Sequence, residues 1–240
     1  MSDTNPTGYR PLPLPDRVQK PDPEALAAVR AFRDDMRKRH SVRDYATRPV
    51  PEALITLAIE AAASAPSGAN RQPWHFVAIS DPAMKARIRE AAEEEERQFY
   101  AGGAGDEWLA ALEPIGTGVD KPHLTDAPWL IVVFAQRHGM SATGERFKHY
   151  YVPESVGIAI GMLITALHQA GLVCLPHTPN PMKFLGPLCG RPAHEKPMMI
   201  LPVGWPAEDA TVPAVAKIKK PREEILSVFR APGEAVPPEA

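Results

Sequence analysis

The feature that most restricts the fold is a run of consecutive apolar residues, Trp129–Phe134, in the middle of the chain. A short segment with no polar residue predicts a β-strand that is buried on both faces. The most apolar helical segment is Ser155–Ala170, and Gly171 directly after it is a natural end for a helix. A sheet with helices packed on it accounts for both segments, and we therefore expect an α+β fold.

Apolar spacing and helix-start signals indicate the other elements. We expect helices over residues 22–39, 51–64 and 81–100, and further strands over residues 74–80, 172–175 and 199–203. The second of these helices carries its expected apolar face at Leu54, Leu57, Ile59 and Ala62. Residues 101–126 contain several glycines and little periodicity, so we expect a mobile segment with a short helix around residues 108–112.

Composition excludes several classes of function. The 240 residues carry a formal net charge of −2, which gives no sign of nucleic-acid binding or of attraction to an anionic membrane. No apolar run approaches the ~20 residues of a membrane span, and the first residues lack the apolar centre of a signal peptide. Two cysteines, Cys174 and Cys189, do not supply the three or four ligands of a zinc site. We therefore expect a cytoplasmic protein without a metal.

Pattern alone does not lead to a function. Neither the GxGxxG fingerprint nor the P-loop of nucleotide-binding proteins is present. The 28 prolines concentrate at the termini and at the boundaries of the expected elements. Residues 1–21 combine prolines with little apolar content, so we expect an extended or disordered N-terminal arm.

Several short segments follow one another in the order and at about the spacing of a known enzyme family. They are Arg39–Arg43 (RHSVR), Ala65–Ala69 (APSGA), Gln72–Trp74, Glu93–Glu96 with Tyr100, Ala127–Pro128, His149–Tyr151, Ala170–Val173, and Leu188–Lys196 (LCGRPAHEK) leading into Leu201–Gly204. Together these segments resemble the iodotyrosine deiodinase branch of the nitroreductase superfamily, from residue 37 to about residue 225.

The resemblance implies a nitroreductase-like fold, in which helices flank a central mixed or antiparallel sheet. It also implies a domain-swapped homodimer with one FMN in each of two clefts at the subunit interface. The FMN domain would cover residues 22–228, with a lid over about residues 91–125 and a C-terminal tail over residues 229–240.

The resemblance further implies which basic residues hold the cofactor. Arg39, Ser41 and Arg43 match the family's contacts to the FMN phosphate and the flavin edge, and His40 stands where the family usually has a second arginine. Lys219 matches a late basic residue that also reaches the phosphate. Arginine suits a dianionic phosphate because its planar fork makes two hydrogen bonds at once. Without the resemblance, these residues would be interpreted as a basic cluster at a helix end.

The loop after the second expected helix is assigned in the same way. Pro66, Ser67 and Gly68 resemble the loop that runs beside the flavin ring, where glycine permits close approach of the backbone. Ala69 matches the residue whose backbone N–H meets the phenolate oxygen of the substrate in the family. An ordinary loop between helix and strand is the alternative interpretation.

Three residues of the expected lid match the family's substrate contacts. Glu96 and Tyr100 are four residues apart and share one helix face, and Lys121 follows on the next segment. In the family, such a carboxylate and tyrosine hydroxyl bind the ammonium of an amino acid, and the lysine binds its carboxylate. A solvated helix face is the alternative interpretation of the glutamate run.

One position departs from the family's pattern. Family members are thought to favour single-electron steps by a threonine hydroxyl that is hydrogen-bonded to flavin N5, and our alignment places Pro176 there. Proline offers neither a hydroxyl nor a backbone N–H. His177 and Thr178 follow as flavin neighbours, and Thr178 would replace the missing hydroxyl only in a shifted loop.

Three functions stay open at this point. The first is an FMN enzyme that reduces a phenolic, halotyrosine-like small aromatic substrate by reductive dehalogenation. The second is a nitroreductase that uses NAD(P)H and reduces nitroaromatics or quinones, which Pro176 favours. The third is a flavin-binding protein without turnover. Because the flavin carries out the redox chemistry, we expect no catalytic side chain, general base or covalent nucleophile.

Overall fold

The computed structural model describes residues 8–14, 16–103, 105–141 and 143–231. The chain divides into two compact units, Met1–Arg39 and His40–Ala240. The first unit contains helix α1 (Asp22–Met36), which has a proline in its first turn and ends before the expected Arg39. No residue of α1 is buried. Residues 1–7 of the predicted N-terminal arm and residues 232–240 of the predicted tail lie outside the described residues.

The second unit is built on a four-stranded antiparallel sheet. Its strands are β1 (Trp74–Ile79), β2 (Trp129–Gln136), β5 (Val173–Cys174) and β6 (Glu195–Gly204), in the order β1-β2-β6-β5. All four expected strands are confirmed, and β6 begins earlier than expected, at Glu195. The long strand β2 lies inside the sheet, between β1 and β6, as its continuous apolar run predicts.

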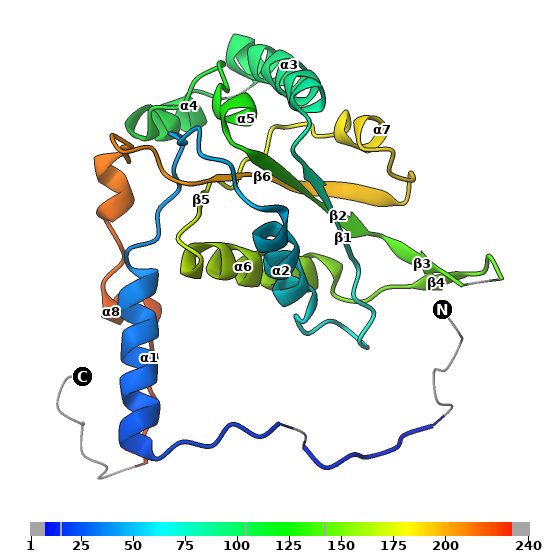
Figure 1. Cartoon of the computed structure of the whole chain (residues 1–240), viewed down its shortest axis with the longest axis vertical. Helices are drawn as coiled ribbons and strands as arrows, with labels where there is room; N and C mark the ends of the chain where they lie inside the picture. Colours follow the sequence, from blue (N-terminus) through cyan, green and yellow to red (C-terminus); the bar gives the residue numbers. More distant parts are fainter. Residues whose placement is uncertain (1–7, 15, 104, 142, 232–240) are drawn as a thin grey trace. The chain divides into compact units, whose positions relative to one another are not determined.

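Helices cover both faces of this sheet, and β2 supplies alternate residues to the two faces (Figure 1). Ile131 and Val133 pack in a cluster with α2 (Glu52–Ala63) and α6 (Val152–Gln169). On the other face, Leu130, Val132 and Phe134 pack in a second cluster. The helices of that face are α3 (Pro82–Gln98), α5 (His123–Asp126) and α7 (Leu185–Leu188). Successive side chains of a strand point to opposite faces of the sheet, so one apolar run contributes to both clusters.

The buried face of α2 differs from the prediction. Its buried residues are Ile55, Ala58 and Ala62, and only Ala62 belongs to the expected face. Leu57 is 62% exposed. Leu54 and Ile59 of the expected face are partly buried against the same cluster, and the fully buried stripe is the one that packs against α6.

The segment between α3 and β2 contains more secondary structure than expected. It forms a π-helical turn η1 (Phe99–Gly103), helix α4 (Asp106–Leu112), a 3₁₀ turn η2 (Glu113–Ile115) and α5. The expected short helix is confirmed as α4, whose first turn carries two acidic residues near the positive end of the helix dipole. Gly102 and Gly116 adopt positive φ angles of 129° and 66°, which permit the reversals between these turns.

A β-hairpin after β2 was missed by the sequence reasoning. It pairs β3 (His138–Met140) with β4 (Arg146–Lys148), and each strand is only three residues long. A Cβ at Gly139 would lie 2.1 Å from the Phe147 ring, so any larger residue there would displace that ring. The remaining short elements are η3 (Ala214–Lys217) and α8 (Arg222–Ile225). Within the described ranges, no helix is long and apolar enough to cross a membrane.

Candidate active site

A cavity of about 450 Å³ is lined by side chains from α3, η1, α4, η2, α5 and the chain after β5. Its polar lining residues are Arg43, Glu96, Tyr100, Thr117, Lys121, His123, His177, Thr178 and Asn180. Aromatic, aliphatic and proline side chains complete the wall. A cavity of this volume, in which apolar side chains and converging polar groups share the wall, is typical of small-molecule sites.

Arg43 reaches the cavity because the chain before it pairs with the edge of the sheet. Ser41 forms a parallel bridge with Cys174 of β5. The backbone N–H of Val42 donates to the carbonyl oxygen of Cys174 at 3.3 Å. The segment that ends at Arg43 is thereby attached beside the residues that follow β5.

The segment after β5 is held in an extended form by β6. His177 exchanges two backbone hydrogen bonds with Ile200, each with an N···O distance of 2.9 Å. Residues two apart in an extended segment share a face. Pro176 and Thr178 are such a pair, and both line the cavity. The threonine hydroxyl is therefore present in the same wall as Pro176.

The three residues predicted to contact the substrate lie together at one wall. The ammonium nitrogen Nζ of Lys121 lies 3.1 Å from Oε2 of Glu96, and their side chains are 3% and 13% exposed. Tyr100 donates its hydroxyl proton to the carbonyl oxygen of Thr117 at 3.2 Å, and Lys121 Nζ lies 6.0 Å from its ring centre. Burial, followed by the charge of Glu96, raises the pKa of Tyr100.

The glutamate run is not a uniformly solvated helix face. Glu94 pairs with Arg97 at 2.7 Å, and both side chains are more than half exposed. The Glu93 side chain is only 16% exposed, close to the value for Glu96. Two of the four glutamates therefore face the interior of the unit.

Two buried histidines line the cavity beside the charged residues. The rings of His123 and His177 meet edge to face with centres 5.2 Å apart. Burial and then the neighbouring Lys121 and Arg43 lower the pKa of His123 to about 4. Burial, then His123, Lys121 and Arg43 lower the pKa of His177 to about 3. Both rings are consequently neutral near pH 7.

Sequence reasoning missed His123. It starts α5 two residues after Lys121, and only that proximity could have indicated it. Among the residues that the structure describes, neither Nε2 of His123 nor Nε2 of His177 has a hydrogen-bond partner. Buried polar atoms of this kind are rare, and a ligand that supplies the missing partner is one of their ordinary explanations.

Comparisons with known proteins decide the family. The model of the nitroreductase family matches residues 36–205. The iodotyrosine deiodinase of Haliscomenobacter hydrossis is 45% identical over 92% of this chain and 99% of that protein. Iodotyrosine deiodinase 1 of Homo sapiens is 42% identical over 86% of this chain and 71% of that protein.

The chain belongs to the nitroreductase family, in its iodotyrosine deiodinase branch. A crystal structure of an oxidised iodotyrosine deiodinase bound to FMN and 3-iodo-L-tyrosine matches with a TM-score of 0.67 and 31% identity. The match covers 83% of this chain and 99% of that chain. A Bacteroides fragilis nitroreductase with bound FMN matches with a TM-score of 0.61 at 20% identity, which supports the shared fold alone.

In this nitroreductase-family chain, the loop predicted to run beside the flavin does not line the cavity. Gly68 bridges Tyr150 and donates its N–H to Oγ of Ser155 at 3.4 Å, at the start of α6. A Cβ at Gly68 would lie 2.6 Å from the Tyr150 carbonyl oxygen, so the backbone approach requires glycine here. The loop therefore lies at the amino end of α6, whereas Arg43 is attached beyond its carboxyl end.

The last residue of this loop adopts an unusual backbone conformation. Ala69 has a φ of 52°, in the left-handed region that non-glycine residues seldom occupy. Ser67 accepts a hydrogen bond from the backbone N–H of Gln72 at 2.9 Å, and Pro66 is exposed. Strained, exposed conformations of this kind concentrate at functional sites.

The remaining predicted cofactor contacts are not brought into the cavity by one chain. His40 and Ser41 are partly buried and do not line it, and Lys219 is exposed after η3. Arg39 belongs to the first compact unit. A single chain thus brings four of the predicted cofactor contacts into the cavity, together with the predicted substrate contacts Glu96, Tyr100 and Lys121. The four are Arg43, Pro176, His177 and Thr178, and the other predicted cofactor contacts lie outside the cavity.

Proposed function

We propose that this protein is an FMN-dependent oxidoreductase that removes halogen reductively from a halotyrosine-like substrate. Such a reaction breaks a carbon–halogen bond, consumes two electrons and one proton, and releases a halide ion. The observation that carries the proposal is the grouping of Glu96, Tyr100 and Lys121 in one wall of the cavity. The names of the relatives, iodotyrosine deiodinases at 42–45% identity, support the same function.

The residues of the cavity fit FMN. Arg43 offers a guanidinium for the phosphate or the flavin edge, and the segment 176–178 offers an extended wall for the ring. Nε2 of His123 and Nε2 of His177, which have no hydrogen-bond partner in the described part of the chain, leave hydrogen-bonding capacity for a polar ring system. When bound, FMN supplies the electrons of the reaction, while the protein supplies position and electrostatics.

The substrate wall suits an amino acid. Glu96 and Lys121 form an ion pair at 3.1 Å, in which the two charges neutralise each other. A zwitterion that enters between them offers its ammonium to Glu96 and its carboxylate to Lys121, so both charges keep a partner. Tyr100 adds a hydroxyl on the same side. An uncharged nitroarene cannot replace these ionic contacts.

Thr178 can supply the hydroxyl donor that dehalogenation needs and that Pro176 lacks. Both residues line the cavity, and only Thr178 carries a hydroxyl. We assign Thr178 as the hydroxyl donor toward flavin N5, the role that the alignment gave to the position of Pro176.

A homodimer would complete the cofactor site. Pro66–Ala69 and Lys219 lie outside the cavity of their own chain, so a second copy is the natural source of these contacts. The second unit also exposes large apolar side chains that a subunit interface would bury, among them Leu57, Ile158 and Phe229 at 62%, 46% and 98%. We propose that two copies share each flavin cleft.

The second candidate is a nitroreductase that takes electrons from NAD(P)H and passes them to nitroaromatics or quinones. Pro176 beside the expected flavin position favours it, because proline supplies no donor to N5. NAD(P)H is also the electron donor that we propose for the dehalogenation.

Binding of a tyrosine analogue tests the substrate class. We expect 3-fluorotyrosine to quench the fluorescence of the protein-bound flavin, and Lys121→Ala to weaken this binding at least about tenfold, since a charged hydrogen bond is lost. Lys196→Ala, which removes an exposed lysine outside the cavity, is the matched control and should bind as the wild type does. Absence of quenching, or an equal loss in both variants, would count against the proposed substrate.

A further inference from the structure

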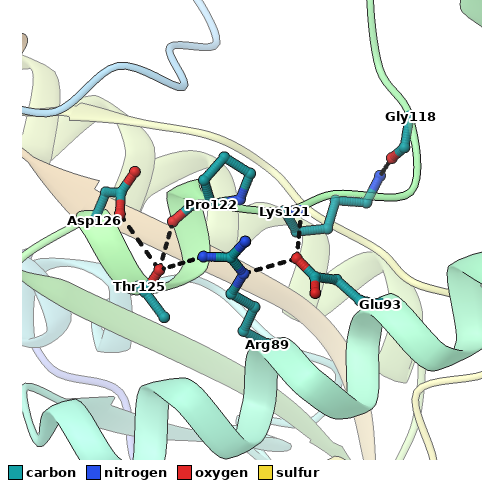
Figure 2. A network of polar contacts seen from close by, with 7 residues as sticks. All are labelled: Arg89, Glu93, Gly118, Lys121, Pro122, Thr125 and Asp126. Carbon is teal, nitrogen blue, oxygen red and sulfur yellow. Dashed lines mark hydrogen bonds and ion pairs between the residues drawn. The ribbon is translucent and has the colours of Figure 1, made fainter.

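Helix α3 contacts Lys121 twice, through Glu96 at the cavity and through Glu93 outside it, and Figure 2 shows the contact with Glu93. Glu96 pairs with its ammonium group at the cavity wall. Glu93, one turn earlier on α3, accepts a hydrogen bond from the backbone N–H of Lys121 at 2.8 Å. The same oxygen, Oε1 of Glu93, accepts a second hydrogen bond from Nε of Arg89 at 2.7 Å.

Arg89 extends this contact to the next helix. Its Nη1 donates to the hydroxyl oxygen of Thr125 on α5 at 3.0 Å, as Figure 2 shows. Thr125 donates in turn to the carbonyl oxygen of Pro122 at 2.9 Å. Arg89 and Glu93 thus join α3 to both ends of the segment from Lys121 to Thr125, with Glu93 at the first end and Arg89 at the second.

A buried lysine strengthens the same connection. Lys85, one turn before Arg89 on α3, is 7% exposed. Its ammonium donates to the carbonyl oxygens of Thr125 at 3.1 Å and Ala127 at 2.7 Å, which α5 leaves unpaired at its end. The carboxyl-terminal border of the expected lid is therefore fixed to α3 by hydrogen bonds within the chain.

We propose that Glu93 and Arg89 are a positioning pair for Lys121, and that they make the site selective for substrates with an amino-acid end. The inference rests on the proposed function, because it assigns Lys121 to the substrate carboxylate. The pair acts through the lysine backbone and touches neither substrate nor cofactor. Glu93 and Glu96 therefore divide two tasks: one holds the backbone of Lys121 and the other its charged end.

Preorganisation gives the physical reason. A lysine side chain has several rotatable bonds, and ordering it when a ligand arrives costs conformational entropy. Here the backbone of Lys121 is fixed by Glu93, and its ammonium also donates to Oγ1 of Thr117 at 3.3 Å and to the carbonyl oxygen of Gly118. The lysine is therefore in place before the substrate, and less entropy is lost on binding.

The ionisation of Glu93 supports a charged hydrogen bond. Burial alone would raise its pKa, but the hydrogen bonds from the Lys121 N–H and from Arg89 outweigh burial and lower the pKa. The pair is partly buried, with side chains 32% and 16% exposed for Arg89 and Glu93. A partly buried, hydrogen-bonded pair is held more firmly than the exposed pair of Glu94 and Arg97.

The test compares two substrates in the FMN-loaded protein. We expect Glu93→Ala to raise KM for 3-iodotyrosine about tenfold and to leave KM for an uncharged nitroarene within about twofold, since one charged hydrogen bond is removed. Glu93→Gln keeps an oxygen that accepts from the Lys121 N–H and should recover most of the loss. Equal changes for both substrates would show a merely structural role and overturn the proposal.

The control is Glu94→Ala, which removes the same charge from the same helix at an exposed position. It should leave both KM values unchanged. A rise of KM for 3-iodotyrosine as large as that of Glu93→Ala would attribute the effect to the helix charge and contradict the proposal.

A second readout does not depend on turnover. Amide hydrogen exchange of the peptide that covers residues 117–127, measured without substrate, should be faster in Glu93→Ala and in Arg89→Ala than in wild type or Glu94→Ala. Unchanged exchange would overturn the positioning pair even if the enzyme is active. If the wild type releases no iodide while exchange responds as expected, the proposed function fails and the positioning of Lys121 stands.

Discussion

At the residue scale, position on a helix decides what each glutamate of α3 does. Ile88 and Ala92 mark the buried stripe of the helix, and Glu96 continues it one turn later. Glu94 lies on the opposite side and is 55% exposed. This stripe was visible in the sequence, because the residues are four apart. The contact of Glu93 with a backbone amide was not, since it joins residues 28 positions apart in the chain.

Thr178 is the second residue whose role depends on geometry. It lines the cavity two positions after Pro176, so it shares the face that the alignment gave to the N5 donor. We expect Thr178→Ala to lower kcat for dehalogenation at least about tenfold, because the variant loses the proposed hydrogen bond to flavin N5, which favours the single-electron steps. Thr178→Ser should restore kcat.

The matched control for this prediction is Pro176→Ala, measured for iodide release and for reduction of a nitroarene. We expect this variant to keep kcat for both substrates within about twofold, since the residue contributes no donor. An unchanged kcat for dehalogenation in Thr178→Ala would show that the hydroxyl donor to flavin N5 comes from another residue.

At the scale of elements, the sheet was predicted well and the segment between α3 and β2 was not. The run Trp129–Phe134 has one physical solution, a strand covered on both faces, and β2 is that strand. The turns from Phe99 to Ile115 depend on glycines with positive φ angles and on contacts with distant residues. Apolar periodicity carries no information about either, so the sequence predicted only the short helix.

Two buried histidines, His123 on α5 and His177 after β5, should make the stability of the protein depend on pH. Burial lowers the pKa values of His123 and His177 to about 4 and about 3, whereas the unfolded chain has histidines with ordinary pKa values of about 6.5. Below pH 6.5 the unfolded state therefore binds more protons than the folded state. The free energy of unfolding should fall as the pH falls, by up to about 1.4 kcal/mol per pH unit for each histidine.

Urea unfolding between pH 7 and pH 5.5, at a fixed FMN concentration, measures this dependence, because most carboxylates stay ionised there. His123→Asn should reduce the slope by about half. A free energy of unfolding that is constant over this interval would contradict the burial of two neutral imidazoles.

At the scale of the whole molecule, the ordered motifs predicted the family and the fold, and the cavity groups seven of the predicted site residues. These are Arg43, Glu96, Tyr100, Lys121, Pro176, His177 and Thr178. Their grouping was predictable only through the resemblance, since they come from four separate stretches of the chain. Pro66–Ala69 and Lys219 lie apart from them, and that division follows if two copies build one site. The homodimer stays a prediction.

The central claim is that the cavity removes halogen from an amino-acid substrate. The most direct measurement is the iodide released from 3-iodotyrosine by the FMN-loaded protein under anaerobic conditions, with dithionite as the electron source. The account predicts catalytic release of one iodide per two electrons consumed, with formation of tyrosine, and much slower release from 2-iodophenol, which lacks the charged end. Reduction of nitroarenes without any release of iodide would contradict the account and favour the nitroreductase function.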